Sequence, residues 1–96
     1  MSLHQRGDLD AAMDIYRDVI RIAPDNSDAL HYLGVAQLQK GNLQRAFELI
    51  SRAIEVNPDN AHFHNHLGEV LRQQNDFPAA VDCYQRALAL SPQYSQ

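Results

Sequence analysis

Apolar side chains recur along this chain at the spacing of one face of an α-helix. One such run consists of Leu9, Ala12, Met13, Tyr16, Val19, Ile20 and Ile22. A second consists of Leu43, Ala46, Phe47, Ile50, Ala53, Ile54 and Val56. Steps of three and four residues predict amphipathic helices, and no run alternates in the manner of a strand. We expect helices at about 9–22, 27–40, 43–56, 61–74 and 77–90.

Residues that end and begin helices stand between these segments. Three of them tolerate the left-handed conformation at a helix C-terminus: Gly7, Gly41 and Asn75. The residue after each is a preferred N-cap: Asp8, Asn42 and Asp76. Such abrupt breaks predict tight antiparallel hairpins. Three prolines close the second helix of each hairpin, namely Pro24, Pro58 and Pro92, and Asn26 and Asn60 can cap the helix that follows.

The hairpins repeat at a fixed interval of 34 residues. Equivalent residues include the three prolines, the alanines Ala12, Ala46 and Ala80, and the pairs Leu33-Gly34 and Leu67-Gly68. Agreement at many positions identifies a helical repeat protein. We divide its single domain into a truncated first repeat at 1–26, a second at 27–60 and a third at 61–94. Only the last turn of the first repeat's opening helix is expected, at about 1–6.

The repeat resembles the tetratricopeptide repeat, whose motif is W-x2-L-G-x2-Y, then A-x3-F, then P. The second unit matches it with Leu30, Leu33, Gly34, Gln37, Ala46, Ile50 and Pro58. The third unit matches it with His64, Leu67, Gly68, Leu71, Ala80, Tyr84 and Pro92. Leu30 and His64 replace the opening aromatic residue. The resemblance implies an all-α, right-handed superhelical solenoid of antiparallel helix hairpins, about two and a half units long, that serves as a protein–protein interaction scaffold.

Composition and charge narrow the partners of such a scaffold. Eight Lys and Arg are outnumbered by twelve Asp and Glu, for a net charge of −4, so the basic stripe that binds nucleic acid is missing. No apolar run approaches the roughly 20 residues that span a bilayer. The single cysteine, Cys83, fits a reducing compartment, and we expect a cytoplasmic protein.

The resemblance implies that the first helix of each unit lines a concave groove. The outward stripe on that helix of the second unit is Asp28, His31, Tyr32, Val35 and Gln39. The stripe on the third unit is His62, Asn65, His66, Glu69 and Gln73. Either stripe could be merely a solvated face, but such faces are usually rich in Lys and Glu. The aromatic and imidazole groups favour a groove that binds a peptide or protein segment, and the absence of Lys and Arg disfavours a grip on carboxylates.

Two alternative functions stay open at this stage. His62, His66 and Glu69 share one helix face and could hold a metal ion, although exposed histidines more often titrate independently. The chain could also be the substrate-presenting arm of a larger enzyme of the glycosyltransferase or sulfotransferase type. The sequence contains no convincing catalytic constellation and no phosphate-binding loop. We therefore expect a chain that is not itself an enzyme and uses no cofactor.

The last helix carries an apolar stripe with no later repeat in this chain to cover it. Its members are Phe77, Val81, Tyr84 and Leu88, at spacings of four, three and four residues. An exposed patch of this kind usually marks a contact. We expect self-association, with a two-fold dimer favoured over a head-to-tail assembly.

Overall fold

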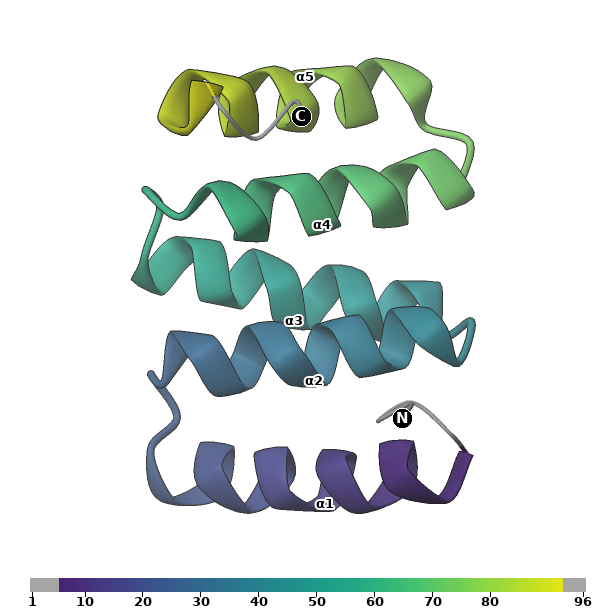
Figure 1. Cartoon of the computed structure of the whole chain (residues 1–96), viewed down its shortest axis with the longest axis vertical. Helices are drawn as coiled ribbons and strands as arrows, with labels where there is room; N and C mark the ends of the chain where they lie inside the picture. The colour runs from purple at the N-terminus through teal and green to yellow at the C-terminus, as the bar shows by residue number, and fades with distance from the viewer. Residues whose placement is uncertain (1–5, 93–96) are drawn as a thin grey trace.

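The computed structural model describes residues 6–92 of the chain (Figure 1). Its five helices are α1 (Arg6–Ile22), α2 (Ser27–Gln39), α3 (Leu43–Val56), α4 (Ala61–Gln73) and α5 (Phe77–Leu90). They stack in chain order, each antiparallel to the one before it (Figure 1). The predicted all-α fold of antiparallel hairpins, about two and a half units long, is confirmed.

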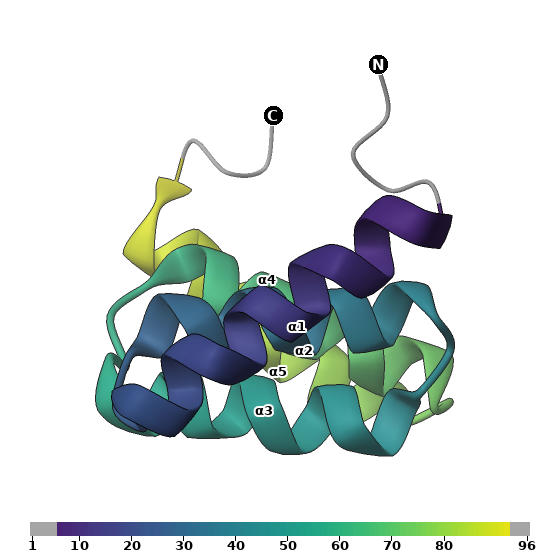
Figure 2. The same ribbon diagram turned by 90° about the horizontal axis from the view of Figure 1, so that it is seen from below.

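Helices α2 and α4 share one side of the stack. α2 contacts α4 directly, while α3 packs against both of them. Viewed along the stack, α3 lies at the lower edge of the molecule and α1 crosses the view obliquely (Figure 2). The first helices of the second and third units therefore form a common face, as the repeat pattern implied.

The turns inside the two complete hairpins have the same hydrogen-bonded geometry. Gly41 has φ 83° and Asn75 has φ 66°, both in the left-handed region. The amide of Asn42 donates to the carbonyl of Gln37, and the amide of Asp76 donates to that of Leu71, each at 2.9 Å. This bond from the second residue beyond the helix cap defines a Schellman turn, which stops the helix and reverses the chain.

Side-chain caps start three of the helices. The Asn26 side chain accepts from the amide of Ala29 at 3.0 Å, and that of Asn60 accepts from the amide of His62 at 2.9 Å. The Asp76 side chain accepts from the amide of Ala79 at 3.4 Å.

Asn42 departs from its predicted role as a cap, because its side chain makes no capping bond to α3. The Asn42 amide group instead donates to the side-chain oxygen of Gln37 at 2.7 Å. Gln37 is buried, and an unpaired amide oxygen there would be costly. The need to satisfy that oxygen accounts for the difference.

The start of the first helix differs from the sequence prediction. α1 begins at Arg6 and continues through Gly7 and Asp8 with no break. Glycine permits the left-handed conformation without requiring it, so a helix can run through such a position. The opening helix predicted at about 1–6 otherwise lies outside the described residues.

Close helix contact is achieved by pairing a glycine with a large side chain in each complete unit. A Cβ atom on Gly34 would lie 2.6 Å from Cγ1 of Ile50, and one on Gly68 would lie 2.7 Å from the Tyr84 ring. The core between the helices is apolar, with these buried members at its centre: Leu9, Met13, Leu30, Leu33, Ala36, Leu49, Ala53 and Phe63. This packing holds α2 and α4 in a fixed arrangement.

Candidate binding face on helices α2 and α4

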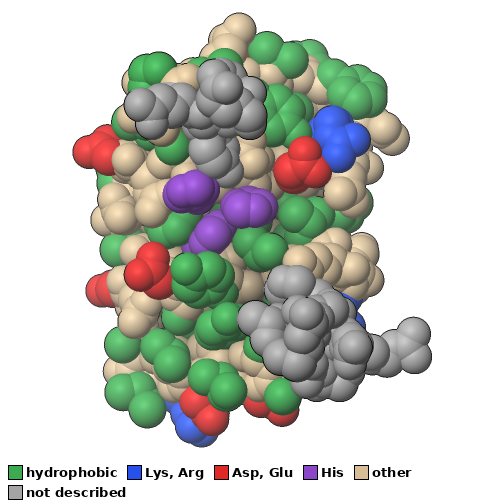
Figure 3. All heavy atoms as spheres, in the orientation of Figure 1, with side chains coloured by type: hydrophobic (Ala, Val, Ile, Leu, Met, Phe, Trp, Pro, Cys, Tyr) green, Lys and Arg blue, Asp and Glu red, His purple; other side chains and the backbone are tan. Residues whose placement is uncertain are grey.

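A row of aromatic and imidazole rings crosses the shared face from α1 to α4. We call Tyr16, His31, Tyr32, Phe63 and His66 the ring cluster. Tyr16 stacks on Tyr32 with ring centroids 5.6 Å apart, and Tyr32 lies 5.2 Å from His31. His31 in turn lies 4.6 Å from Phe63 and 4.8 Å from His66. Histidine side chains gather in the middle of this face, with hydrophobic groups beside them (Figure 3).

His31 and His66 join α2 to α4 by a side-chain contact. Nε2 of His31 lies 2.9 Å from Nδ1 of His66, which also lies 2.9 Å from the main-chain oxygen of His62. His31 is only 6% exposed, and burial, followed by the neighbouring His66 and His62, lowers its pKa to about 4. Burial also lowers the pKa of His66. Both rings are therefore neutral near pH 7.

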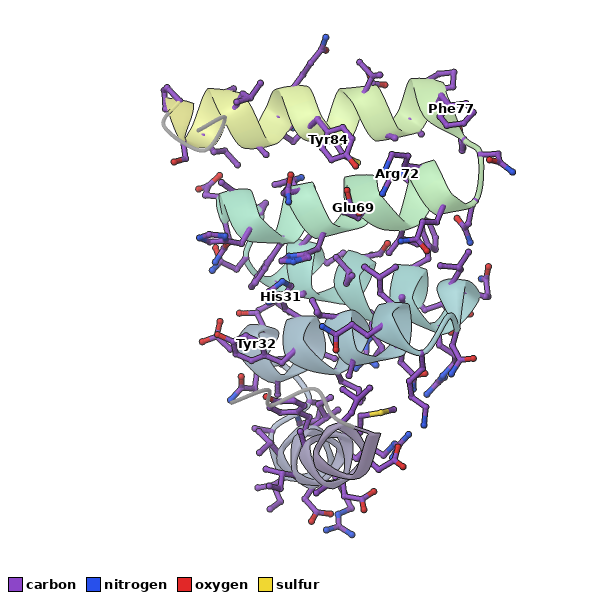
Figure 4. The ribbon with its side chains drawn as sticks, turned by 45° about the vertical axis from the view of Figure 1, so that its right-hand side comes forward. His31, Tyr32, Glu69, Arg72, Phe77 and Tyr84 are labelled. Carbon is purple, nitrogen blue, oxygen red and sulfur yellow. The ribbon has the colours of Figure 1, made fainter. Side chains whose placement is uncertain are left out.

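Glu69 is engaged by two other groups. Arg72 donates to one carboxylate oxygen at 2.8 Å, and the phenol of Tyr84 donates to the other at 2.9 Å (Figure 4). The hydrogen bond from Arg72 is the largest cause of a lowered pKa for the Glu69 carboxyl. The negative charge of Glu69 is thus already paired.

The proposed metal ligands do not come together. Within residues 6–92, no group of three His, Cys, Asp or Glu side chains is placed to hold an ion. Glu69 shares a helix face with His62 and His66, as predicted from the spacing, but its two oxygens are bound by Arg72 and Tyr84. In this arrangement, His62, His66 and Glu69 do not form a three-ligand site.

The predicted groove residues differ in how far they reach the surface. His31 is buried, although the sequence pattern placed it on an outward stripe. Four others are half-buried, namely Val35, Asn65, His66 and Glu69. The exposed members are Asp28, Tyr32, Gln39, His62 and Gln73. The direct contact between α2 and α4 explains the burial of His31, because α4 covers that side of α2.

Two members of the ring cluster were absent from the predicted groove. Tyr16 was assigned only to the apolar face of its helix, and Phe63 lies outside the predicted stripe of the third unit. Tyr16 aligns with Ile50 and Tyr84 in the repeat, which are packing positions. Its contact with Tyr32 depends on how α1 sits against α2, so no local pattern indicated it.

Tyr84 occupies a different environment from the rest of its predicted stripe. Phe77, Val81 and Leu88 are exposed, at 55%, 49% and 39%. Tyr84 is half-buried, with its ring against Gly68 and its phenol bonded to Glu69 (Figure 4). Its place in the repeat directs it toward the first helix of its own unit. Tyr84 is therefore an internal packing residue rather than part of the exposed surface.

His64 and Cys83 lie away from the candidate binding face, and their surroundings indicate structural roles. His64 is buried, and its Nε2 donates to the carbonyl of Pro58 at 2.7 Å. Both residues line an open hollow of about 440 Å³ between α3, α4 and α5. Burial raises the pKa of the Cys83 thiol, so the thiol stays protonated and weakly reactive.

Comparison with known families identifies the class of this protein. A tetratricopeptide repeat profile matches residues 33–95, and a second profile of the same kind of repeat matches residues 2–41. The chain belongs to the tetratricopeptide repeat family, as its motif implied. Within residues 6–92, no helix has the length and apolar character needed to span a membrane.

Several solved structures share the fold. A mutant O-GlcNAc transferase from Thermobaculum terrenum is 36% identical with a TM-score of 0.91, over 96% of this chain and 18% of the transferase chain. A crystal structure of MamA is 28% identical with a TM-score of 0.85, over 98% of this chain and 57% of that one. MamA from Desulfovibrio magneticus RS-1 is 21% identical with a TM-score of 0.83, over 98% and 53%. The comparison with curated proteins found no match.

Proposed function

We propose that the face formed by α2 and α4 binds a segment of a partner protein. Tetratricopeptide repeats generally mediate protein–protein interactions, and this chain belongs to that family. The observation that carries the proposal is the ring cluster, which crosses three helices and leaves Tyr32 49% exposed. Aromatic side chains held in place in this way are typical anchors of protein interfaces.

The proposed face is held rigid before a partner arrives. Tyr32 stacks on Tyr16, and His31 packs against Phe63, so their side chains lose little freedom on binding. A preformed surface lowers the entropic cost of association. This rigidity favours a specific, saturable interaction over loose adsorption.

Charge on the proposed face favours an uncharged partner segment. The predicted groove residues contain no Lys or Arg, and of their two carboxylates Glu69 is paired with Arg72 while Asp28 is exposed. His31 and His66 are neutral near pH 7, because burial lowers the pKa of each. We expect affinity to depend weakly on salt, since few charges line this face and their long-range attraction is small.

A peptide-display selection against the whole chain tests the proposal. The affinity of the selected peptide is then measured by calorimetry for the unaltered chain, for Tyr32→Ala and for His66→Ala. We expect each substitution to weaken binding by roughly 1–3 kcal/mol. Val56→Ala is the matched control, because Val56 is 43% exposed but lies on α3. Unchanged affinity in the Tyr32→Ala, His66→Ala double variant would rule out this face.

A second proposal is that these repeats present substrates to a larger enzyme. It is favoured by the 36% identity to the repeats of a chain described as an O-GlcNAc transferase, a likeness that spans 18% of that chain. The test is the reading frame that encodes this sequence in its source genome. The proposal is supported if the same frame encodes a transferase domain and if Tyr32→Ala reduces transfer to protein acceptors. A frame without such a domain would leave a scaffold that binds without catalysis.

We further propose that two copies associate through the exposed face of α5. Phe77, Val81 and Leu88 are exposed there, at 55%, 49% and 39%. Burying such a patch is favourable at about 25 cal/mol per Å² of apolar surface. A two-fold arrangement pairs the same face of each copy.

A further inference from the structure

The contacts around His66 determine which of its ring nitrogens carries the proton. Nδ1 of His66 lies 2.9 Å from the main-chain oxygen of His62, and an oxygen of this kind only accepts. Nδ1 must therefore hold the proton, because a bare nitrogen would place two lone pairs against each other. The same N–H also points to Nε2 of His31, 2.9 Å away, which then acts as acceptor. In neutral His66 the other nitrogen, Nε2, is left as a hydrogen-bond acceptor.

The side chain of His66 places this acceptor at the edge of the proposed face. The two ring nitrogens lie on different edges of an imidazole, so Nε2 is turned away from His31 and from the His62 carbonyl. His66 is half-buried, and histidine side chains gather at the surface in the middle of the molecule (Figure 3). Tyr32, at 49% exposure, lies on the other side of His31. An acceptor and an exposed aromatic ring that flank His31 suit a chain segment that brings both a donor and an apolar side chain.

Charged and titratable groups around the pair come from several helices. On α4 they are His62 and Glu69. α5 acts through Tyr84, whose phenol donates to Glu69. α1 contributes the ring of Tyr16, which reaches the pair through Tyr32, and α3 packs on the other side with apolar Leu49 and Ala53.

We propose that His66 accepts a hydrogen bond from a main-chain N–H group of the bound segment through Nε2, and that protonation of Nε2 reverses this preference. The inference rests on the proposed binding function and adds the chemistry of recognition. A main-chain N–H is an uncharged donor that every extended segment carries, and it must be paired when it is buried. A carboxylate would face the lone pair of Nε2 at neutral pH and would be repelled.

As the pH falls, His66 gains a proton before His31 does. A proton on Nε2 of His66 keeps the Nδ1–H contact with His31 and turns the exposed edge into a donor. A proton on Nε2 of His31 would set two N–H groups face to face at 2.9 Å, so His31 gains its proton later. Burial lowers the pKa of both rings, that of His31 to about 4, and the geometry of the contact sets their order. Loss of N–H recognition therefore precedes disruption of the pair.

The first arm of the test uses the chain without a bound partner. Long-range proton–nitrogen correlation spectra of the imidazole groups report which nitrogen carries the proton, with signals assigned from His31→Leu, His62→Gln and His66→Phe. We expect the Nδ1–H form of His66 at about pH 7.5, where an imidazole of ordinary pKa is neutral. Observation of the Nε2–H form would overturn the proposal.

The second arm uses N-methylacetamide, which has one N–H donor, and N,N-dimethylacetamide, which has none. We expect the first to shift the Nε2 signal of His66 at neutral pH and the second to leave it unchanged. The response should vanish once His66 is protonated, and it should persist in Val56→Ala, a change on α3. Equal responses to the two amides would overturn the proposal. If the amides behave as expected but display selection yields no peptide, the proposed function fails while the acceptor assignment stands.

Discussion

The two complete hairpins, α2–α3 and α4–α5, fulfil one repeat pattern with different chemistry. Both reverse at a left-handed residue, Gly41 in the first and Asn75 in the second. Both pair a glycine of the first helix with a large side chain of the second, as Gly34 does with Ile50. The turn and this close approach are what the repeat preserves, because both decide whether the helices can pack.

The hairpins differ at positions that the packing leaves free to vary. Ile50 is fully buried, whereas its counterpart Tyr84 is half-buried and reaches Glu69. Tyr32 in the first hairpin aligns with His66 in the second, and both belong to the ring cluster. Equivalent positions thus supply unlike groups to one continuous face. The variation between repeats is what gives that face its particular chemistry.

The largest contrast is expected between Ile50→Ala and Tyr84→Ala. Ile50 has no exposed surface, so Ile50→Ala leaves a closed cavity and should lower the free energy of unfolding by about 2–5 kcal/mol. Tyr84→Ala opens toward solvent and should cost less. Urea denaturation followed by circular dichroism measures both. Equal losses would mean that the two hairpins depend on this contact to the same degree.

The equivalent positions His31 and Asn65 should contribute differently to the loss of stability in acid. The pKa of His31 is lowered from 6.5 to about 4, so the unfolded chain binds the proton more readily than the folded chain. The stabilisation that neutral His31 provides is therefore complete above its pKa in the unfolded chain, which is 6.5. It is lost as the pH falls toward 4, and the loss amounts to up to about 3 kcal/mol.

The measurement is urea denaturation across that pH range for three proteins. His31→Leu should flatten the decline, whereas Asn65→Leu, at the aligned position of α4, should retain it. His66 and Glu69 contribute in the same direction, since a lowered pKa of the histidine and of the carboxyl both weaken the fold in acid. A His31→Leu protein with an unaltered decline would show that those other groups account for it.

The difference in stability between Gly34→Ala and Gly68→Ala should be smaller than the differences above. A methyl group at Gly34 would lie 2.6 Å from Cγ1 of Ile50 and 3.3 Å from Cβ of Leu49, both fixed in the core. Overpacking costs about 1–3 kcal/mol, partly offset by roughly 1 kcal/mol of helix propensity. At Gly68 the Tyr84 ring can swing outward. We expect a net loss for Gly34→Ala and a change near zero for Gly68→Ala in thermal unfolding, and the reverse order would contradict this account.

The smallest effect on folding is expected from Val81→Glu. Val81 is 49% exposed, so its replacement should change the free energy of unfolding by no more than about 0.5 kcal/mol. It should nevertheless dissociate a dimer formed through α5, as judged by sedimentation at tens of micromolar. Tyr84→Glu is a poor test, because Tyr84 already bonds to Glu69. An unaltered chain that sediments as a 10.9 kDa monomer would exclude the dimer.

Local chemistry in the sequence was sufficient to predict the helices and their turns. The 34-residue repetition, the prolines and residues such as Gly41 and Asn75 predicted five helices in hairpins, and the structure confirms them. The prediction was wrong at Gly7, where α1 continues, and at Asn42, whose side chain serves Gln37 instead of α3. Gly7 can adopt two conformations and Asn42 can bond to two partners. In each case the surrounding structure decides between them.

The sequence alone determined the helices and their hairpins, because helical periodicity and capping act within a few residues, and the family resemblance implied which helices share a face. Which atoms meet on that face was decided by tertiary structure. His31 was predicted to face outward, yet α4 covers it and places Nδ1 of His66 2.9 Å from its Nε2. Tyr84 was predicted to be exposed, yet it bonds to Glu69. Such contacts depend on the distance and rotation between helices, which follow from the packing of the whole stack.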